Sequence, residues 1–328
     1  MTFIVAVCNA VGRMSAALML MALAADACAQ PTYPSKAIRL IVPSTAGGNR
    51  DLSARLLGQK LAEAWGQNVI VDNRPGANTL VGSEALVKAT PDGHTLLLVD
   101  VSHLINGLVV PNYPYNALKV FAAVGTFNNS PYVLTINPSL PVSDLKEFVA
   151  HAKSRPGQLN YGTSGTASAA HLTAEIMTGV LGIKMQHIAY KGGGQVLNDL
   201  ASGQVQMYLA TAVTVVPFIT AGRIKPLALA AESRLGALPR VPTFAEAGVP
   251  GFNVKNWNGV VAPVGTPKPV IDKLAGEIAR ILTLPDLKEK LTSLGGEPFA
   301  TTPAQFTELM KTDQARYAKI LAHITLDR

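Results

Sequence analysis

The stretch IRLIVPSTAGGNRDLSARLLGQKLAEA, residues 38–64, carries the pattern on which the fold prediction depends. Its first part, IRLIVP, is a short apolar run typical of a strand buried in a parallel sheet. A turn with two glycines follows, and residues 51–64 then repeat apolar side chains at helical spacing. A strand that leads through a glycine turn into a helix is the first half of a β–α unit.

The same alternation of strand and helix continues along most of the chain. Further strands are predicted at residues 68–72, 94–99, 132–136, 159–162, 184–188 and 206–210, and further helices at 80–89, 143–154, 166–180 and 195–202. Three helices then follow one another, at 267–282, 285–294 and 303–323. The last begins with Thr302-Pro303-Ala304-Gln305, which supplies an N-cap, a proline at the first helical position and a capping-box glutamine. This pattern predicts an α/β fold with parallel strands.

Residues 1–29 have the organisation of a secretory signal peptide. An apolar run at residues 15–25 follows Arg13 and ends at Ala27-Cys28-Ala29, an A-x-A cleavage signal. The run is too short to span a bilayer. We therefore expect export to the periplasm with cleavage after Ala29; a buried N-terminal helix is the alternative.

Removal of this leader leaves about 300 residues, enough for two lobes or domains. Both cysteines, Cys8 and Cys28, lie in the leader, so the mature chain must be stabilised by its core without disulfides. The net charge stays at +7, because Arg13 and Asp26 cancel. The basic residues are scattered, which argues against nucleic-acid binding, and a mildly positive field suits an anionic ligand.

Two strand-to-helix loops are candidate ligand sites, since ligands of open α/β sheets bind at the carboxyl ends of strands near helix N-termini. In the first loop, within residues 41–51, Gly47 and Gly48 allow close approach to the backbone, and Thr45 and Asn49 can donate hydrogen bonds. Asp51 fits a helix cap.

The second loop lies within NYGTSGTASAAH, residues 160–171. Ser164, Thr166 and Ser168, with the local N–H groups, are suited to hold a carboxylate. Each loop alone is equally compatible with a plain tight turn. Because one occurs in each βα series, together they predict a cleft between two lobes.

Motifs of several enzyme classes are missing. Ser164 has Gly162 before it but Thr166 after it, so the G-x-S-x-G nucleophile elbow is absent. Neither G-x-x-x-x-G-K-[ST] nor G-x-G-x-x-G occurs. The six histidines show no H-x-x-x-H or H-x-H spacing. We therefore predict a protein that is not an enzyme and has no cofactor and no metal; His171 is expected to pack or cap, and Lys191 to lie in a turn near the cleft.

Nine stretches resemble one known family: YPSKAIRLIVP, AGGNRD, VIVDNRPGAN, ATPDGHTLLL, LNYGTSG, HIAYKGGG, LASGQVQM, VPTFAEAGVPGF and APVGTP. In this order they are similar to the tripartite tricarboxylate transporter receptors, the Bug-type periplasmic binding proteins, over essentially the whole mature chain. The resemblance implies a two-lobed type II binding-protein fold with two crossover segments, a small carboxylate ligand, inner-membrane transporter subunits as partners, and a monomer. A sensor receptor for a signalling protein and an exported hydrolase remain alternatives.

The resemblance also implies where lobes and contacts lie. One lobe would comprise residues 31–128 plus 260–328, and the other 129–259. Phe127 and Trp257 would lie near the crossovers, either lining the cleft or in the core. The ligand contacts implied are Thr45, Ala46, Gly47, Gly48, Asn49, Arg50, Phe127, Ser164, Thr166, Ala167, Ser168, Ala210 and Thr211.

Three residues depart from the family pattern. Ala46 stands where the family usually has proline, and Ala210 where it often has aspartate. Without that carboxylate, we expect a ligand that has no ammonium group. Arg50 replaces a small polar residue, and it either clamps a second carboxylate or points into solvent. With one anion-suited loop on each lobe, the sequence favours an aliphatic or aromatic diacid.

Overall fold

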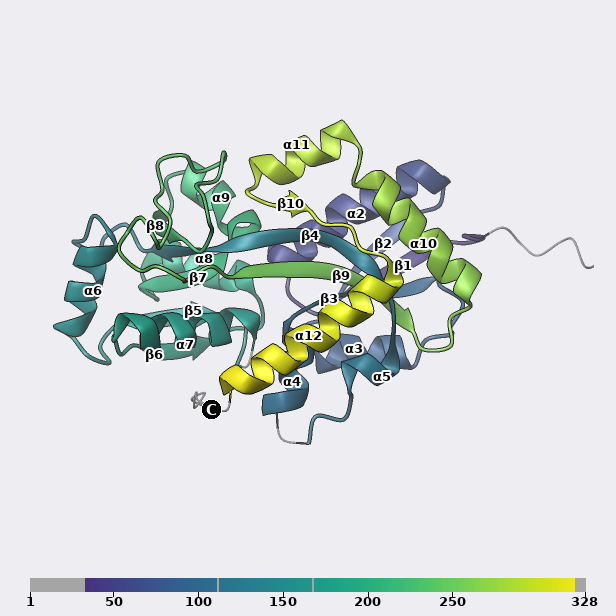
Figure 1. Ribbon diagram of the computed structural model, residues 1–328, viewed down its shortest axis with the longest axis horizontal. Coiled ribbons are helices and arrows are strands. Elements are labelled where there is room, and N and C mark those ends of the chain that lie inside the picture. Colours follow the sequence, from purple (N-terminus) through teal and green to yellow (C-terminus); the bar gives the residue numbers. More distant parts are fainter. Residues whose placement is uncertain (1–32, 111, 167, 322–328) are drawn as a thin grey trace, which may run out of the picture. The chain divides into compact units, whose positions relative to one another are not determined.

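The computed structural model describes residues 33–110, 112–166 and 168–321 (Figure 1). The signal-peptide prediction, on residues 1–29, lies outside this described part. The described residues from Lys36 onward belong to one compact unit, and the description below concerns this unit. In this part of the chain, no helix combines the length and apolar character that crossing a membrane requires.

Three parallel strands form one end of the sheet system, as the apolar runs predicted. β1 (Ile38–Val42) lies between β2 (Val69–Asn73) and β3 (Thr95–Asp100), and pairs parallel with both. The connections are α2 (Asn49–Trp65) and α3 (Leu80–Val87). After β3 the chain forms α4 (Ser102–Val109) and the short α5 (Ala117–Val120).

A second set of strands carries the other predicted βα units. β5 (Asn160–Thr163) pairs parallel with β6 (Gln186–Ala189) and with β7 (Met207–Thr211). The strand β8 (Lys225–Leu229) completes the set. The helices of this part are α6 (Leu145–Lys153), α7 (Ala169–Leu181), α8 (Gly193–Ser202) and α9 (Ala212–Thr220).

Two long strands connect these sets. β4 (Phe121–Ile136) pairs antiparallel with β9 (Lys255–Pro263) as far as Pro131, and from Tyr132 onward with β7. β9 also pairs antiparallel with β3, which gives the strand order β2-β1-β3-β9-β4-β7-β5-β6. In Figure 1, β4 and β9 run side by side across the middle of the picture. The two βα series are therefore linked by one strand that changes its partner.

The C-terminal helices are α10 (Lys268–Ile281), α11 (Pro285–Ser293) and α12 (Pro303–Leu321), with β10 (Glu297–Pro298) pairing with β4 between them. The predicted capping box is present: Gln305 N donates to Thr302 Oγ1 over 3.2 Å, and Thr302 N donates to Gln305 Oε1 over 2.9 Å. Trp257 lies in the core, because its Nε1 donates to Asp313 Oδ2 over 2.7 Å and its ring packs edge-on against Phe306.

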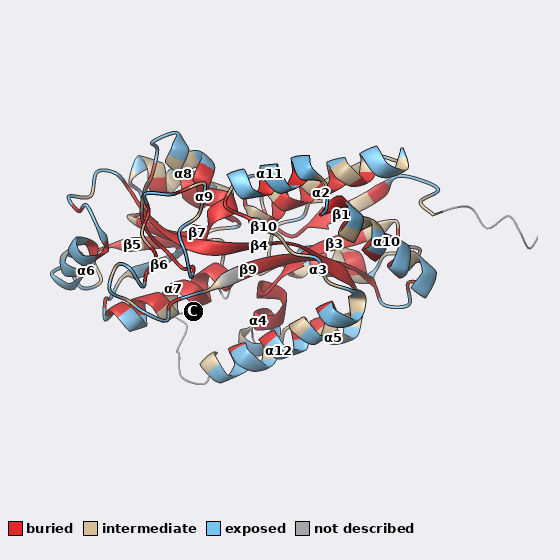
Figure 2. Ribbon diagram, turned by 45° about the horizontal axis from the view of Figure 1, so that its top comes forward, coloured by how far each residue is buried: buried red, intermediate tan, exposed pale blue. Residues whose placement is uncertain are grey.

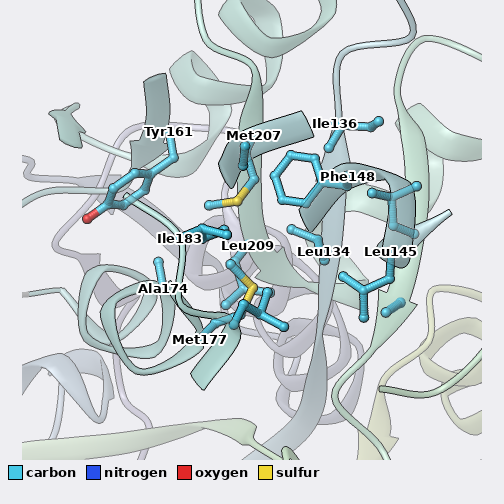
Figure 3. Packing of buried hydrophobic residues seen from close by; sticks show 14 of the residues in the cluster. Leu134, Ile136, Leu145, Phe148, Tyr161, Ala174, Met177, Ile183, Met207 and Leu209 are labelled. Atoms are coloured by element: carbon cyan, nitrogen blue, oxygen red, sulfur yellow. The ribbon is translucent and has the colours of Figure 1, made fainter. Parts of the chain in front are cut away.

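Burial follows the strands and the inner faces of the helices (Figure 2). A hydrophobic cluster combines side chains from strands β4, β5 and β7 with side chains from α6 and α7 (Figure 3). Phe148 is fully buried in this cluster. Burial of one such side chain stabilises a fold by about 1.5–3 kcal/mol, so the core can hold the site loops without disulfides.

Candidate ligand-binding site

Two adjoining cavities lie where strands β1, β3, β5 and β7 end and the following helices begin. The smaller cavity has a volume of about 50 Å³, and the larger about 260 Å³. Arg50, Ser102 and Ser164 line both, so these side chains stand at their junction. The cavities lie at the edge of the sheet where the sequence predicted a cleft.

The smaller cavity is surrounded by helix N-termini. Residues at the start of α2, α4, α7, α8 and α9 line it: Asn49, Ser102, Ala169, Gly193 and Thr211. The dipole of each helix favours a negative charge at this end, typically by about 0.3–1 kcal/mol. Free N–H groups at helix N-termini are also hydrogen-bond donors for an anion. The arrangement is therefore suited to an anionic group.

The first loop is held by Asp51. Its Oδ2 accepts from Gly47 N over 2.9 Å and from Arg55 Nε over 3.0 Å, and its Oδ1 accepts from Asn73 Nδ2 over 3.0 Å. Burial alone would raise the pKa of Asp51, but these hydrogen bonds outweigh it and leave that pKa below its usual value. The carboxylate thus fixes the turn, while Gly48, the N-cap of α2, provides no side-chain cap.

The residues predicted in this loop divide into two groups. Gly48, Asn49 and Arg50 line the smaller cavity. Asn49 uses its side chain within the protein, because its Oδ1 accepts from Asn258 Nδ2 over 3.1 Å. Its backbone is therefore the part that remains for a ligand.

Thr45, Ala46 and Gly47 lie beside the glycines that begin α8 and are not among the residues that line the two cavities. A Cβ on Gly192 would overlap the Thr45 hydroxyl, and one on Gly194 would overlap the Ala46 carbonyl oxygen. This part of the loop after β1 therefore packs directly against the start of α8.

Arg50 is buried, with 7% of its surface exposed, so the prediction that it points into solvent is wrong. Its Nη2 donates to Asp100 Oδ1 over 2.7 Å. Burial would raise the pKa of Asp100, but the Arg50 guanidinium and His103 outweigh that effect and hold the pKa below its usual value. Asp100 is therefore ionised, and it is a cavity residue that the sequence analysis did not identify.

The second loop lies at the larger cavity, which Ser164, Thr166 and Ser168 line. Ser168 is also the N-cap of α7, since its Oγ accepts from His171 N over 3.1 Å. The next N–H, of Ala169, donates to Ser102 Oγ over 3.0 Å. Part of the N-terminus of α7 is therefore already paired within the protein. Ala167 lies outside the described residues.

The larger cavity contains residues that the sequence analysis missed. The loop Gly76–Thr79 lines it, and Asn106 Nδ2 donates to Asn78 O and, over 3.1 Å, to Thr79 Oγ1. Lys191 lines it as well, which places the turn after β6 at the cleft as predicted. Asn106 lies on α4, which directly follows the predicted strand at residues 94–99. This position after a strand was the sequence feature that could have indicated a cavity residue.

Two further predicted residues, Ala210 and Thr211, line the smaller cavity at the end of β7. Thr211 Oγ1 and Thr214 Oγ1 share a hydrogen bond of 3.0 Å. With alanine at position 210, Asp100 is the one carboxylate among the described residues that line the two cavities. The described lining of the two cavities therefore has no second carboxylate besides Asp100.

Phe127 does not belong to the cavity lining. Its side chain is 0% exposed within β4, and it contributes to neither cavity. The prediction that it lines the cleft is therefore corrected to a core position, because the strand directs this ring into the interior. Its carbonyl accepts from Phe299 N over 3.1 Å, which ties β4 to the C-terminal segment.

His171 is packed, as expected. It is 0% exposed and its ring stacks on that of His187, with centroids 3.7 Å apart. Burial, followed by the neighbouring His187, lowers the pKa of His171 to about 3. Among the described residues, no group of His, Cys, Asp or Glu side chains is placed to hold a metal ion.

Comparison with known proteins shows which family this chain resembles. Residues 53–326 match the family described as "Tripartite tricarboxylate transporter family receptor". The protein BugT of Bordetella pertussis is 34% identical over 292 residues, which are 88% of this chain and 90% of BugT.

Two solved structures are similar over nearly their whole length. The R. palustris protein solved with adipate has 32% identity and a TM-score of 0.86, over 88% of this chain and 97% of that one. The periplasmic binding protein BugD has 29% identity and a TM-score of 0.85, over 88% and 98% of the two chains. The predictions of a two-lobed binding-protein fold and of a receptor rather than an enzyme are confirmed. Since the family match extends over most of the chain, the protein belongs to the tripartite tricarboxylate transporter receptor family.

Proposed function

We propose that the mature chain is a periplasmic receptor that captures a small organic diacid and presents it to the membrane subunits of a tripartite transporter. Export rests on the A-x-A sequence at Ala27-Cys28-Ala29. Amino-terminal sequencing of periplasmic material tests this part, with Gln30 as the expected first residue. An intact leader on soluble cytoplasmic protein would contradict it.

One observation carries the ligand class: five helix N-termini surround a cavity that Arg50 also lines. Helix dipoles and a guanidinium both favour an anion. A planar carboxylate accepts hydrogen bonds from backbone N–H groups at these helix ends, and such charge-assisted bonds are stronger than neutral ones. The first carboxylate of the ligand binds here.

The second carboxylate binds in the larger cavity. Ser164 and Thr166 supply hydroxyl groups there, and Lys191 supplies a positive charge. The two cavities adjoin, so a short chain or an aromatic ring connects the carboxylates past Arg50. The relative solved with adipate, itself a diacid, supports this ligand class.

The lobes of this receptor are residues 31–128 plus 260–328, and 129–259. This division is supported by β4, which changes its partner from β9 to β7 between Pro131 and Tyr132. The receptor acts as a monomer. Its ligand has no ammonium group, because Ala210 cannot pair with one and an unpaired buried charge is costly.

A thermal-shift panel of matched acids tests the function. A ligand at about a hundred times its dissociation constant stabilises a protein by about 2.7 kcal/mol. At roughly 2–4 °C per kcal/mol, adipate should raise the melting temperature by several degrees, and hexanoate, which lacks one carboxylate, clearly less. Equal shifts from the two acids would contradict the two-ended site.

A further inference from the structure

An ion pair lies at the junction of the two cavities. Arg50 is the second residue of α2, and Asp100 is the last residue of β3. Their exposed fractions are 7% and 5%, and Nη2 of Arg50 lies 2.7 Å from Oδ1 of Asp100. The arginine lines both cavities and the aspartate lines the smaller one. Any ligand that passes from one cavity to the other therefore meets this pair.

Asp100 connects the arginine to the opposite side of the cleft. Its Oδ1 also accepts from Ser102 N over 2.9 Å. The Ser102 hydroxyl in turn accepts from Ala169 N, the first residue of α7, over 3.0 Å. The position of the guanidinium is therefore fixed by residues on β3, α4 and α7.

Asp100 does not provide acceptors for all the N–H donors of the Arg50 guanidinium. The bond to Asp100 is the one hydrogen bond of the Arg50 side chain among the described residues, and its buried Nε has no acceptor in that part of the chain. A guanidinium presents several N–H donors in a planar fork, and a buried donor without an acceptor is unfavourable. A ligand carboxylate at the junction supplies the missing acceptor.

We propose that Arg50 determines ligand specificity by binding the second carboxylate of a diacid, the one in the larger cavity, and that Asp100 is the resident counter-ion of Arg50. Before the ligand binds, Asp100 neutralises the buried Arg50 guanidinium. After the ligand binds, Asp100 and the second carboxylate of the ligand share this guanidinium. A monoacid binds with its single carboxylate at the helix N-termini and does not use the arginine. This inference rests on the proposed capture of a diacid and adds the residues that select it.

Loss of Arg50 should then weaken adipate binding, and loss of Asp100 should strengthen it. Arg50→Gln alone would leave Asp100 as an unpaired buried charge and would destabilise the fold. The test therefore uses the charge-balanced double variant Arg50→Gln/Asp100→Asn and the single variant Asp100→Asn. Arg280→Gln is the control, since Arg280 is exposed on α10 and pairs with Glu277. Calorimetry gives the dissociation constants of adipate and hexanoate.

In the double variant, adipate binding should weaken by about tenfold to a hundredfold, the loss expected for a charge-assisted hydrogen bond. Hexanoate binding should change by less than about threefold, so the preference for adipate disappears. In Asp100→Asn, the unliganded melting temperature should fall because Arg50 loses its counter-ion. Adipate should then bind on the order of tenfold more tightly, since its carboxylate no longer shares the cation with an anion. Arg280→Gln should retain the affinities of the unaltered chain.

The outcomes separate this inference from the function on which it rests. Equal affinity of the unaltered chain for adipate and hexanoate contradicts the diacid function and the inference with it. A preference for adipate that survives in the double variant contradicts the inference alone. So does an Asp100→Asn variant that is less stable but binds adipate no more tightly, because that is the behaviour of a purely structural ion pair.

Discussion

The loops that follow β1 and β5 are similar in composition but lead into helices that start differently. Both are rich in glycine and small hydroxyl residues, and each leads into a helix beside the cavities. The N-cap of α2 is Gly48, which has no side chain with which to cap the helix. The N-cap of α7 is Ser168, whose Oγ accepts from His171 N, and Ala169 N donates to the Ser102 hydroxyl.

This difference indicates how the two ends of a ligand are held. At the first loop, the N-terminus of α2 keeps its N–H groups for an anion, and the helix dipole acts on it directly. At the second loop, protein groups have taken part of the N-terminus of α7, and the hydroxyls of Ser164 and Thr166 remain. We therefore expect binding to be more sensitive to changes at the first loop than at the second.

The largest effect is expected from Gly194→Ala, which disrupts the contact between the first loop and α8. The new methyl group would overlap the Ala46 carbonyl, so the backbone must move. Such overpacking typically costs about 1–3 kcal/mol. We expect this cost to fall on the bound state and to weaken adipate binding by roughly fivefold to a hundredfold in calorimetry.

Gly276→Ala is the matched control. Gly276 lies within α10, and a Cβ there would meet no atom within 4 Å. Alanine favours a helix over glycine by about 0.8–1.0 kcal/mol, so the melting temperature should rise slightly with affinity unchanged. If both alanine variants bind adipate like the unaltered chain, the contact at Gly194 has no part in binding.

A smaller effect should follow from Gly48→Asp, which tests the free N-terminus of α2. The backbone at Gly48 has φ of −86°, and a Cβ there would lie 3.5 Å from Gly193 N, so a side chain fits. The new carboxylate would cap α2 and occupy the N–H groups that the ligand needs. Adipate binding should weaken by about tenfold, which corresponds to about 1.4 kcal/mol.

Gly48→Asn separates capping from charge, because it adds a similar cap without a charge. Its loss of affinity should be smaller than that of Gly48→Asp. Unliganded stability should rise by only a few tenths of a kcal/mol in either variant. Unchanged adipate affinity in Gly48→Asp would show that the ligand does not bind at this helix end.

At the second loop, Ser168→Ala should affect stability more than binding. The variant loses the N-cap of α7, which typically costs about 1 kcal/mol. The melting temperature should fall by about 2–4 °C in calorimetric scans. Adipate affinity should change less than in Gly48→Asp. The opposite ranking of the two variants would reverse the comparison between the loops.

The smallest effect on the free energy of unfolding at neutral pH is expected from a substitution of His171, in the first turn of α7. Its pKa of about 3 lies below the unfolded value of about 6.5, so the unfolded chain binds more protons between these pH values. The free energy of unfolding should therefore rise with pH from about 3 to 6.5 and level off above. His171→Phe should reduce this slope in denaturant titrations at several pH values. Identical slopes in the two proteins would rule out burial of His171 as the cause.

The sequence predicted the parallel strands well because they are continuous apolar runs. It missed most of β4 and all of β9, since these strands contain buried asparagines in place of an apolar pattern. Asn258 is 0% exposed, and its Nδ2 donates to Asn128 Oδ1 over 2.9 Å. The polar side chains satisfy each other across strands, a relation that no local pattern reveals.

Only the part of the candidate site that a local sequence pattern reveals was predicted. The glycine and hydroxyl loops were visible because each follows a predicted strand. Asp100 was missed although it ends one of those strands, because its partner Arg50 is distant in sequence. Phe127 was misplaced because the direction of its side chain depends on strand pairing in β4, which hydrophobicity does not give.

The crystal structure of the mature chain with adipate is the most direct test of a diacid held at two unequal ends. One carboxylate should accept hydrogen bonds from the first N–H groups of α2, beside Asn49 and Arg50. The other should lie in the larger cavity, within hydrogen-bonding distance of Ser164 or Thr166. Both carboxylates in one cavity, or a ligand that contacts neither loop, would contradict the account.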